Sequence, residues 1–383
     1  MSWIKNFVLV VMVSSLTFKI LDLAFGAVMP GEYIITSLER AADRSIILRE
    51  FNPNQSASIA PSNFYMKGLD TLEQRNYSVT IDSNGFIENG NIIQPNPDLR
   101  IIFFGGSTTE TLFVDEKNRF PSIVERSLRN AMNQKVVVHN AGVSGNNSMH
   151  SNLALIAKGI PLKPDFVVLM HNINDFSLLS KTDSYWVSPI SRALVSKNFS
   201  PFFTIEDSAR SLTFKALKKI KNFLFPNLYD YLKPRLFSNL NLHKDEFKGF
   251  RSKASVFDTE AEKQFRSSLI TFVKLAETWG IKPILMTQFN RVKRDDPIFQ
   301  QFYKSLPRGS DISPEEFVQS YQEFNDIIRE VAKQSNIPLI DLELLVPKSK
   351  EYIYDPVHLN DEGSKYVANI ISNQIIKIIS SDT

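Results

Sequence analysis

The sequence predicts an α/β fold in which helices cover both faces of a five-stranded parallel sheet. Two observations lead to this prediction. From residue 99 onward, short apolar runs alternate with longer segments whose apolar residues recur at helical spacing, which is typical of a parallel sheet wrapped by helices. The chain also has 383 residues, 43% hydrophobic and 22% charged, so it contains enough apolar side chains for one large domain.

The first half of the pattern predicts strand, helix, strand, helix and strand. In order, these elements are residues 99–104, 120–132, 136–138, 153–160 and 166–170. The segment 120–132 has Val124 and Leu128 on one helical face, and the strands are short and rich in β-branched residues. Such a βαβαβ unit predicts parallel pairing, because parallel neighbours need a crossover between them.

The pattern returns after an interruption, with helix, strand, helix, strand and helix. These elements are expected at residues 265–276, 283–287, 317–331, 337–342 and 366–379. The interruption, residues 176–256, shows no strand alternation and predicts a helical insertion. Its part 201–256 holds eleven Lys or Arg against five Asp or Glu. Two interpretations stay open for it: a surface that contacts anionic lipid or an acidic polymer, and a solvated basic helix packed on the main domain.

The N-terminus predicts a membrane segment. Residues 7–18 and 23–29 are mostly apolar, with Lys19 and Asp22 between them on one helical face. We expect residues 1–30 to be an uncleaved signal anchor, with a cleaved signal peptide as the alternative. Both place the rest of the chain outside the cytoplasm. Residues 31–98, rich in turn signals, predict a linker with a small β flanking region, which leaves residues 99–383 as the main domain.

The overall composition excludes several classes of function. A net charge of +3 is too small for this length to indicate a nucleic-acid binder. There is no cysteine, which excludes disulfides, thiolate metal sites and a lipid-bearing cysteine. The five histidines show no metal-ligand spacing, so we expect no metal.

A glycine-rich turn with a serine follows the first expected strand. Gly105 and Gly106 let the backbone turn sharply, and Ser107 at a helix start exposes its hydroxyl and its own N–H. Such a serine can act as a nucleophile and as one donor to an oxyanion. Thr109 stands where an α/β-hydrolase elbow needs glycine, and no P-loop lysine follows. Taken alone, the turn is also compatible with a helix cap or a phosphate site.

Two motifs rich in asparagine and glycine follow the second and third expected strands. Residues 140–146 are Asn-Ala-Gly-Val-Ser-Gly-Asn, and residues 172–175 are Asn-Ile-Asn-Asp. A tetrahedral oxyanion needs donors that are fixed before its charge appears, and a glycine N–H with an asparagine amide meets this need. Simple loop caps are the alternative interpretation.

Asp355 and His358 form the last motif, shortly before the C-terminal helix. Histidine is the side chain whose pKa suits a general base near neutrality, and a serine hydroxyl needs such a base. A nearby carboxylate can hold the imidazole in the right tautomer. A spacing of three residues lets one loop present both groups.

In this order the four motifs resemble those of the SGNH (GDSL-like) hydrolase family. The resemblance covers residues 99–383 without the insertion and implies a flavodoxin-like three-layer α/β/α fold. It implies a catalytic triad and an oxyanion hole without cofactor or metal. The implied triad is Ser107, Asp355 and His358, and the implied oxyanion donors are Ser107, Gly145 and Asn174.

The chain departs from the family pattern at two places. Gly-Gly-Ser-Thr replaces Gly-Asp-Ser-Leu around Ser107, which leaves the nucleophile in place. Asn172 replaces the glycine of Gly-x-Asn-Asp, and we expect it to narrow the site or to add a donor.

The implied function is that of a serine esterase or acylhydrolase which removes acetyl groups from a cell-envelope carbohydrate. The expected location is the bacterial inner membrane, crossed once, with the catalytic domain on the periplasmic side. Expected partners are a small acyl ester or acylated glycan and the membrane, but no nucleic acid. The alternatives are an O-acyltransferase on an envelope polysaccharide, a lipase, and a catalytically silent glycan-binding protein.

Overall fold

The computed structural model describes residues 49–66, 69–91, 95–186, 250–252, 255–306 and 310–381, together with Asn6 and Val13. The expected signal anchor at residues 1–30 and most of the expected insertion at residues 176–256 lie outside these described residues. Within them, none of the helices combines the length and the apolar character needed to cross a membrane.

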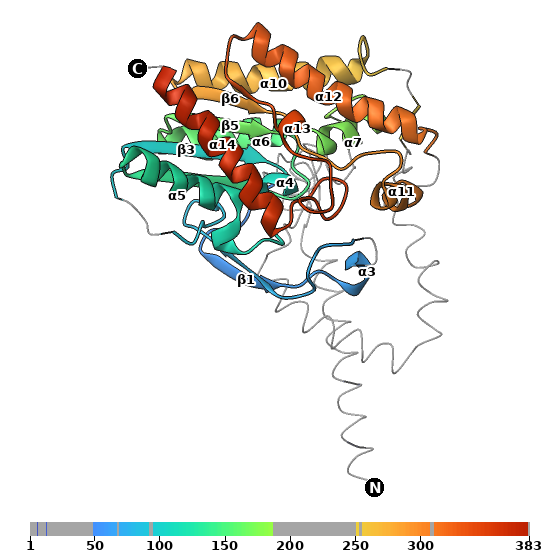
Figure 1. Ribbon diagram of the computed structural model, residues 1–383, viewed down its shortest axis with the longest axis horizontal. Helices are drawn as coiled ribbons and strands as arrows, with labels where there is room; N and C mark the ends of the chain where they lie inside the picture. Colours follow the sequence, from blue (N-terminus) through green and yellow to red (C-terminus); the bar gives the residue numbers. More distant parts are fainter. Residues whose placement is uncertain are drawn as a thin grey trace.

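A five-stranded parallel sheet forms the centre of the domain, as the sequence predicts (Figure 1). Its spatial order is β4-β3-β5-β6-β7. The strands are β3 (Leu99–Gly105), β4 (Val136–Gly142), β5 (Phe166–Met170), β6 (Lys282–Met286) and β7 (Leu339–Ile340). The pairing places Gly105 opposite Gly142 and Met170, and Met286 opposite Met170 and Ile340. The carboxyl ends of all five strands therefore lie along one edge.

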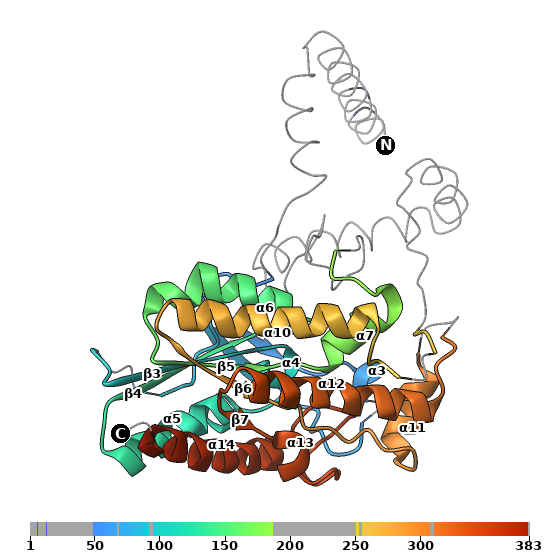
Figure 2. The same cartoon turned by 90° about the horizontal axis from the view of Figure 1, so that it is seen from above.

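Helices cover both faces of this sheet, which makes three layers (Figure 2). One face carries α5 (Phe120–Met132) and α14 (Asp361–Ser381), whose apolar residues share a buried cluster with the sheet. The other face carries the helices whose residues form the second large cluster. These are α6 (Ser148–Ala154), α7 (Ile173–Thr182), α10 (Glu260–Thr278) and α12 (Pro314–Gln334).

The long helices begin where the sequence carries capping residues. Ser313 accepts a hydrogen bond from the N–H of Glu316, whose carboxylate accepts one from the N–H of Ser313, so a capping box starts α12. At the start of α10, the hydroxyl of Thr259 accepts a hydrogen bond from the N–H of Glu262. Such caps satisfy amides that have no partner within the helix.

Shorter elements connect these layers. They are α4 (Ser107–Glu110), η1 (Glu116–Asn118), η2 (Leu155–Gly159), η3 (Ile160–Leu162), α11 (Pro297–Lys304) and α13 (Leu342–Leu345). Residues 153–160, which the sequence places in a helix, are helical throughout but not as one α-helix. The α-helix ends at Ala154 and widens into a π turn before Pro161, because proline removes a backbone donor and clashes with the preceding turn.

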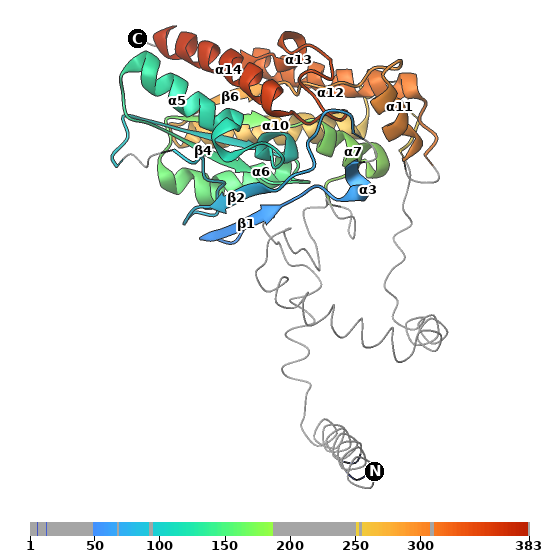
Figure 3. The ribbon, with the colours of Figure 1, turned by 60° about the horizontal axis from the view of Figure 1, so that its bottom comes forward.

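An antiparallel pair of strands and one helical turn lie N-terminal to the sheet and pack beside it (Figure 3). They are β1 (Gln55–Ile59), β2 (Tyr77–Ile81) and α3 (Asn63–Met66). We call residues 55–81 the flank. Ile87, just after it, bridges to both Ile81 and Asn140, and Tyr77 shares a buried cluster with Tyr354. The flank therefore belongs to the same packed body as the sheet.

Helix α7 changes one predicted boundary. The sequence places the start of the insertion at Phe176, but α7 continues to Thr182 and buries Phe176 and Leu179 completely. Phe176 packs against Phe317 and Phe324 of α12. This segment is thus part of the core, because its aromatic and aliphatic side chains fill the space under α12.

Candidate active site

A cavity of about 480 Å³ opens at the edge where the strands end. Four of the five residues that the sequence predicts for the site line it, namely Ser107, Gly145, Asn174 and His358. The fifth, Asp355, is only 7% exposed and lies behind His358. Loops that are up to 251 residues apart along the chain thus meet at one cavity.

Ser107 is the first residue of α4, which directly follows β3. Its Oγ lies 2.8 Å from Nε2 of His358. The first amides of a helix have no acceptor within that helix, so the backbone N–H of Ser107 is available near its own hydroxyl. The strand end and the helix start together present both groups to the cavity.

One tight loop presents His358 and Asp355. The N–H of Tyr354 donates to the carbonyl of His358 at 2.9 Å, and Ile353 bridges to Leu359, so the chain folds back on itself here. The Nδ1 of His358 lies 2.6 Å from Oδ2 of Asp355. Ser107, His358 and Asp355 therefore form one continuous line of hydrogen bonds.

The carboxylate of Asp355 is held from both sides. Its Oδ1 accepts the backbone N–H groups of Val357 and His358, each at 2.8 Å. Burial by itself raises the pKa of Asp355, but the charge of His358 and the hydrogen bonds from His358 and Val357 outweigh burial and lower it below the usual range. Asp355 is consequently an anion at neutral pH.

Gly145 and Asn174 stand beside Ser107 in the cavity wall. Gly145 has a φ of +79°, in the left-handed region that favours glycine. The Nδ2 of Asn174 donates to the carbonyl of Asn146 at 2.7 Å, which uses one of its two hydrogens. A Cβ at Gly106 would lie 2.4 Å from this nitrogen, so the second glycine of the turn is needed for the close approach.

The expectation that Asn172 narrows the site or adds a donor is wrong. Asn172 is fully buried and does not line the cavity. Its Nδ2 donates to the backbone carbonyl of Tyr321 at 2.9 Å, so the amide is directed under α12. The side chain fastens the start of α7 to α12 instead of contacting a ligand.

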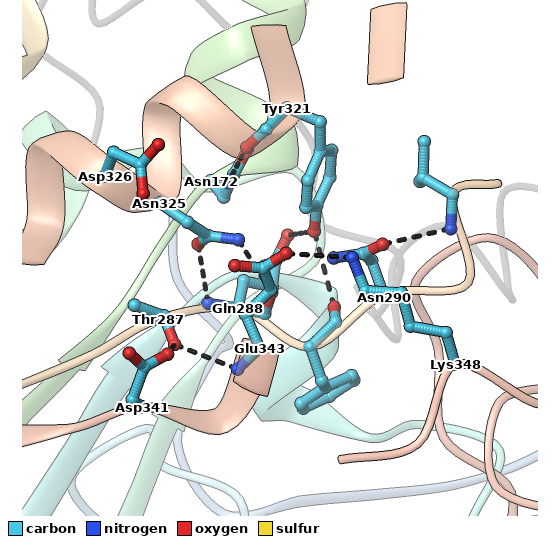
Figure 4. A network of polar contacts seen from close by, with 12 residues as sticks. Asn172, Thr287, Gln288, Asn290, Tyr321, Asn325, Asp326, Asp341, Glu343 and Lys348 are labelled. Carbon is cyan, nitrogen blue, oxygen red and sulfur yellow. Dashed lines mark hydrogen bonds and ion pairs between the residues drawn. The ribbon is translucent and has the colours of Figure 1, made fainter. Parts of the chain in front are cut away.

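Gln288, just after β6, is a buried connector that the sequence analysis missed (Figure 4). Its Nε2 donates to Thr108 Oγ1 at 2.9 Å, next to Ser107. Its Oε1 accepts the N–H of Ile173 at 3.0 Å, next to Asn174, and the hydroxyl of Tyr321 at 2.6 Å. One side chain thus joins the serine turn to the start of α7.

Glu110 is a second buried acid that the sequence analysis missed. It lines the cavity, is 1% exposed, and accepts a hydrogen bond from the hydroxyl of Ser144. Burial raises the pKa of Glu110 to about 7, although the Ser144 hydroxyl and the charges of Arg119 and His358 oppose this rise. No local sequence pattern distinguishes this glutamate from an exposed one.

Glu110 makes stability depend on pH. In the folded chain it keeps its proton up to pH about 7, whereas its ordinary pKa is 4.5. Between these values the folded state binds more protons than the unfolded state, so the free energy of unfolding falls as pH rises. This fall amounts to at most about 3 kcal/mol, and it is expected to be absent in Glu110→Gln, whose side chain does not titrate. Urea denaturation of the unaltered protein and of Glu110→Gln at pH 5 and pH 8 measures the effect. If the two free energies of unfolding differ by the same amount at both pH values, Glu110 does not have the raised pKa.

A second group of serine, histidine and aspartate side chains lies under the surface. Ser148 Oγ donates to Asp175 at 2.5 Å, and His171 Nδ1 lies 3.6 Å from Asp175. The Nε2 of His171 contacts the hydroxyl of Ser151 at 2.7 Å. All four are at most 1% exposed, and none lines the cavity.

The chemistry of this buried group differs from that of a triad. The hydroxyl of Ser148 is bonded to a carboxylate and not to the imidazole. Burial lowers the pKa of His171 to about 3 and raises that of Asp175 to about 6. Because Ser148 is fully buried and does not line the cavity, the group serves to connect α6 to the start of α7.

No family model matches the chain. It is 30% identical over 82 residues to the uncharacterized lipoprotein YqeF of Bacillus subtilis (strain 168), a match that covers 21% of this chain and about a third (33%) of the relative. Among solved structures it is similar to Axe2, an acetylxylan esterase from Geobacillus stearothermophilus, with 14% identity over 74% of this chain and 96% of that chain and a TM-score of 0.40. It is also similar to a lipase/acylhydrolase from Enterococcus faecalis, with 17% identity over 72% and 95% of the two chains and a TM-score of 0.40.

Proposed function

We propose that this chain is a serine ester hydrolase of the SGNH type. The observation that carries the proposal is the line from Ser107 Oγ to His358 Nε2 at 2.8 Å and from His358 Nδ1 to Asp355 Oδ2 at 2.6 Å, with the serine in a cavity wall. Nucleophile and base within hydrogen-bond reach, and a carboxylate that orients the base, are the geometry of acyl transfer.

The proposed reaction proceeds in two acyl transfers. His358 Nε2 takes the proton of Ser107 as Oγ bonds to the ester carbonyl carbon. The imidazolium then gives this proton to the leaving alkoxide as the ester C–O bond breaks, which leaves an acyl-serine. Water, deprotonated by the same imidazole, attacks the acyl carbon, and Ser107 recovers its proton when the acid departs. Asp355 stays ionised throughout and stabilises the imidazolium.

The oxyanion of each tetrahedral intermediate needs fixed donors. The backbone N–H groups of Ser107 and Gly145 and the amide of Asn174 are proposed for this role, because all three residues border the same cavity.

Asn174→Ala is expected to lower kcat for p-nitrophenyl acetate about 100-fold to 1000-fold, since one oxyanion donor is lost. The matched control is Asn172→Ala, which removes a neighbouring buried amide bonded to Tyr321 outside the cavity. Steady-state kinetics of both variants measure the effect. A kcat for Asn174→Ala within threefold of the unaltered protein would exclude Asn174 from the oxyanion hole.

A fluorophosphonate probe tests the proposed function directly, because it phosphonylates an activated serine. Peptide mass spectrometry is expected to locate the label on Ser107. A catalytically silent glycan-binding protein would stay unlabelled and would not hydrolyse p-nitrophenyl acetate. This outcome would end the esterase proposal.

The proposed substrate is an O-acetylated carbohydrate of the bacterial cell envelope. The apolar N-terminal segment supports this location, with the catalytic domain on the periplasmic side of the inner membrane. The name lipoprotein given to YqeF agrees with an envelope protein. This chain has no cysteine to carry a lipid, so the apolar segment itself is the proposed anchor.

An O-acyltransferase is the second candidate, because the same triad passes its acyl group to a sugar hydroxyl if water is kept out of the cavity. Mass spectrometry of envelope glycans from cells that carry the active protein or its Ser107→Ala variant separates the two. A hydrolase lowers glycan acetylation relative to the variant, and a transferase raises it.

A further inference from the structure

The flank forms one wall of the cavity. Its residues Ile59, Pro61 and Tyr65 line the cavity together with Ser107 and His358. The sequence by itself predicts only a linker with a small β flanking region here. Its contribution to the wall raises the question whether it also acts on the proposed triad.

Tyr65 contacts the triad from this wall. Its hydroxyl donates to Oδ2 of Asp355 at 3.1 Å, across 290 residues of sequence. The same oxygen accepts Nδ1 of His358 at 2.6 Å. With the two amides on Oδ1, the carboxylate has four donors for its roughly four acceptor sites.

The side chain of Tyr65 is held in place and keeps its proton. Its ring packs against Phe113 with centroids 5.7 Å apart. Burial, followed by the charge of Asp355, raises the pKa of Tyr65 well above its usual value. The hydroxyl is therefore a neutral donor throughout the working pH range.

We propose that Tyr65 is a positioning residue for the reaction proposed above, on which this inference rests. Its hydroxyl holds the Asp355 carboxylate in the plane that the His358 ring requires. Without this donor, His358 is the one partner of Oδ2 that remains among the described residues, and the carboxylate can rotate about its two amides. The flank is thereby part of the active site.

The hydroxyl has a second consequence, for the pH profile. The Tyr65 hydroxyl donates to Oδ2 and so weakens the attraction between the Asp355 carboxylate and the imidazolium of His358. Without it, Asp355 stabilises the imidazolium more strongly, so the acidic limb of kcat/KM moves to higher pH. Among the described residues, the titratable neighbours of His358 also include Glu110, which lines the same cavity, and Tyr354, whose ring stacks on the imidazole at 5.8 Å. Tyr65→Phe removes neither group, but it takes away the side-chain hydrogen bond that Tyr65 and Tyr354 share.

The test compares Tyr65→Phe with Tyr77→Phe. Tyr77 is a matched control, since its ring also packs on Phe113, at 5.6 Å, and its hydroxyl donates to the carbonyl of Glu73, away from the triad. For p-nitrophenyl acetate, Tyr65→Phe is expected to lower kcat about 10-fold with KM changed less than about twofold, and to move the acidic limb up by roughly half a pH unit. Tyr77→Phe is expected to leave kcat and the profile unchanged.

The outcomes are distinguishable. If the unaltered protein neither turns over the ester nor labels with fluorophosphonate, the proposed function fails. If it does both and Tyr65→Phe keeps the kcat and the acidic limb of the unaltered protein, the inference about Tyr65 fails. Equal losses of kcat and Tm in both tyrosine variants also overturn it, because they indicate packing alone.

A double variant covers the case in which Tyr65→Phe is less stable. If Tyr65 acts through Asp355, adding Tyr65→Phe to Asp355→Asn lowers kcat by less than about twofold further. Independent, multiplicative losses in the double variant contradict the inference.

Discussion

Replacing Ser107 by alanine is expected to reduce turnover of p-nitrophenyl acetate by at least roughly 10⁴-fold, because the nucleophile is gone and only the oxyanion donors and binding remain. The fold should stay intact, since the change removes one hydroxyl that bonds to His358 at the cavity wall. The cost in stability is expected to be about 1 kcal/mol. Active-site titration with the fluorophosphonate probe checks that the nucleophile is lost. Circular dichroism checks that the fold stays intact.

Ser148→Ala is the matched control for this variant. It removes a serine from the buried group that also contains His171 and Asp175. The hydroxyl of Ser148 bonds to Asp175, Tyr185 and Ser268, so Tm should fall while kcat stays within about threefold. Loss of activity in Ser148→Ala together with full activity in Ser107→Ala would move the catalytic site to the buried group.

Asp355→Asn is expected to lower kcat by about 10⁴-fold, the second large effect. Both oxygens of Asp355 accept N–H groups, so an amide nitrogen must face a donor in either orientation. If it faces Nδ1 of His358, the ring carries its proton on Nε2 instead. It then cannot accept the proton of Ser107.

Asp341→Asn is the control for this second variant. Asp341 is also a carboxylate with a lowered pKa, which its ion pair with Arg329 and its bond to Thr287 maintain against burial. It lies at the end of β7 and does not line the cavity. We expect Asp341→Asn to lower the free energy of unfolding in urea without changing kcat. An Asp355→Asn protein that keeps more than a tenth of kcat would contradict the role given to Asp355.

The five strands and most of the helices were predictable because their signals are local. The segment 166–170 is an unbroken apolar run that becomes β5, and the helical spacing in 120–132 becomes α5. The start of the insertion was not predictable at Phe176. Only the packing of this ring against Phe317 and Phe324 shows that α7 continues into the core.

The positions of Ser107, Gly145 and Asn174 near one another follow from the sequence, because parallel strands end at one edge and each motif directly follows a strand. The tertiary structure alone decided the rest of the site. Tyr65 reaches Asp355 across 290 residues, and Gln288 reaches Thr108 across 180. No regular sequence spacing predicts such pairs, because each contact forms only when the elements that carry the two residues pack together. The buried state of Glu110 has the same origin, because desolvation depends on what surrounds a carboxylate and not on its neighbours along the chain.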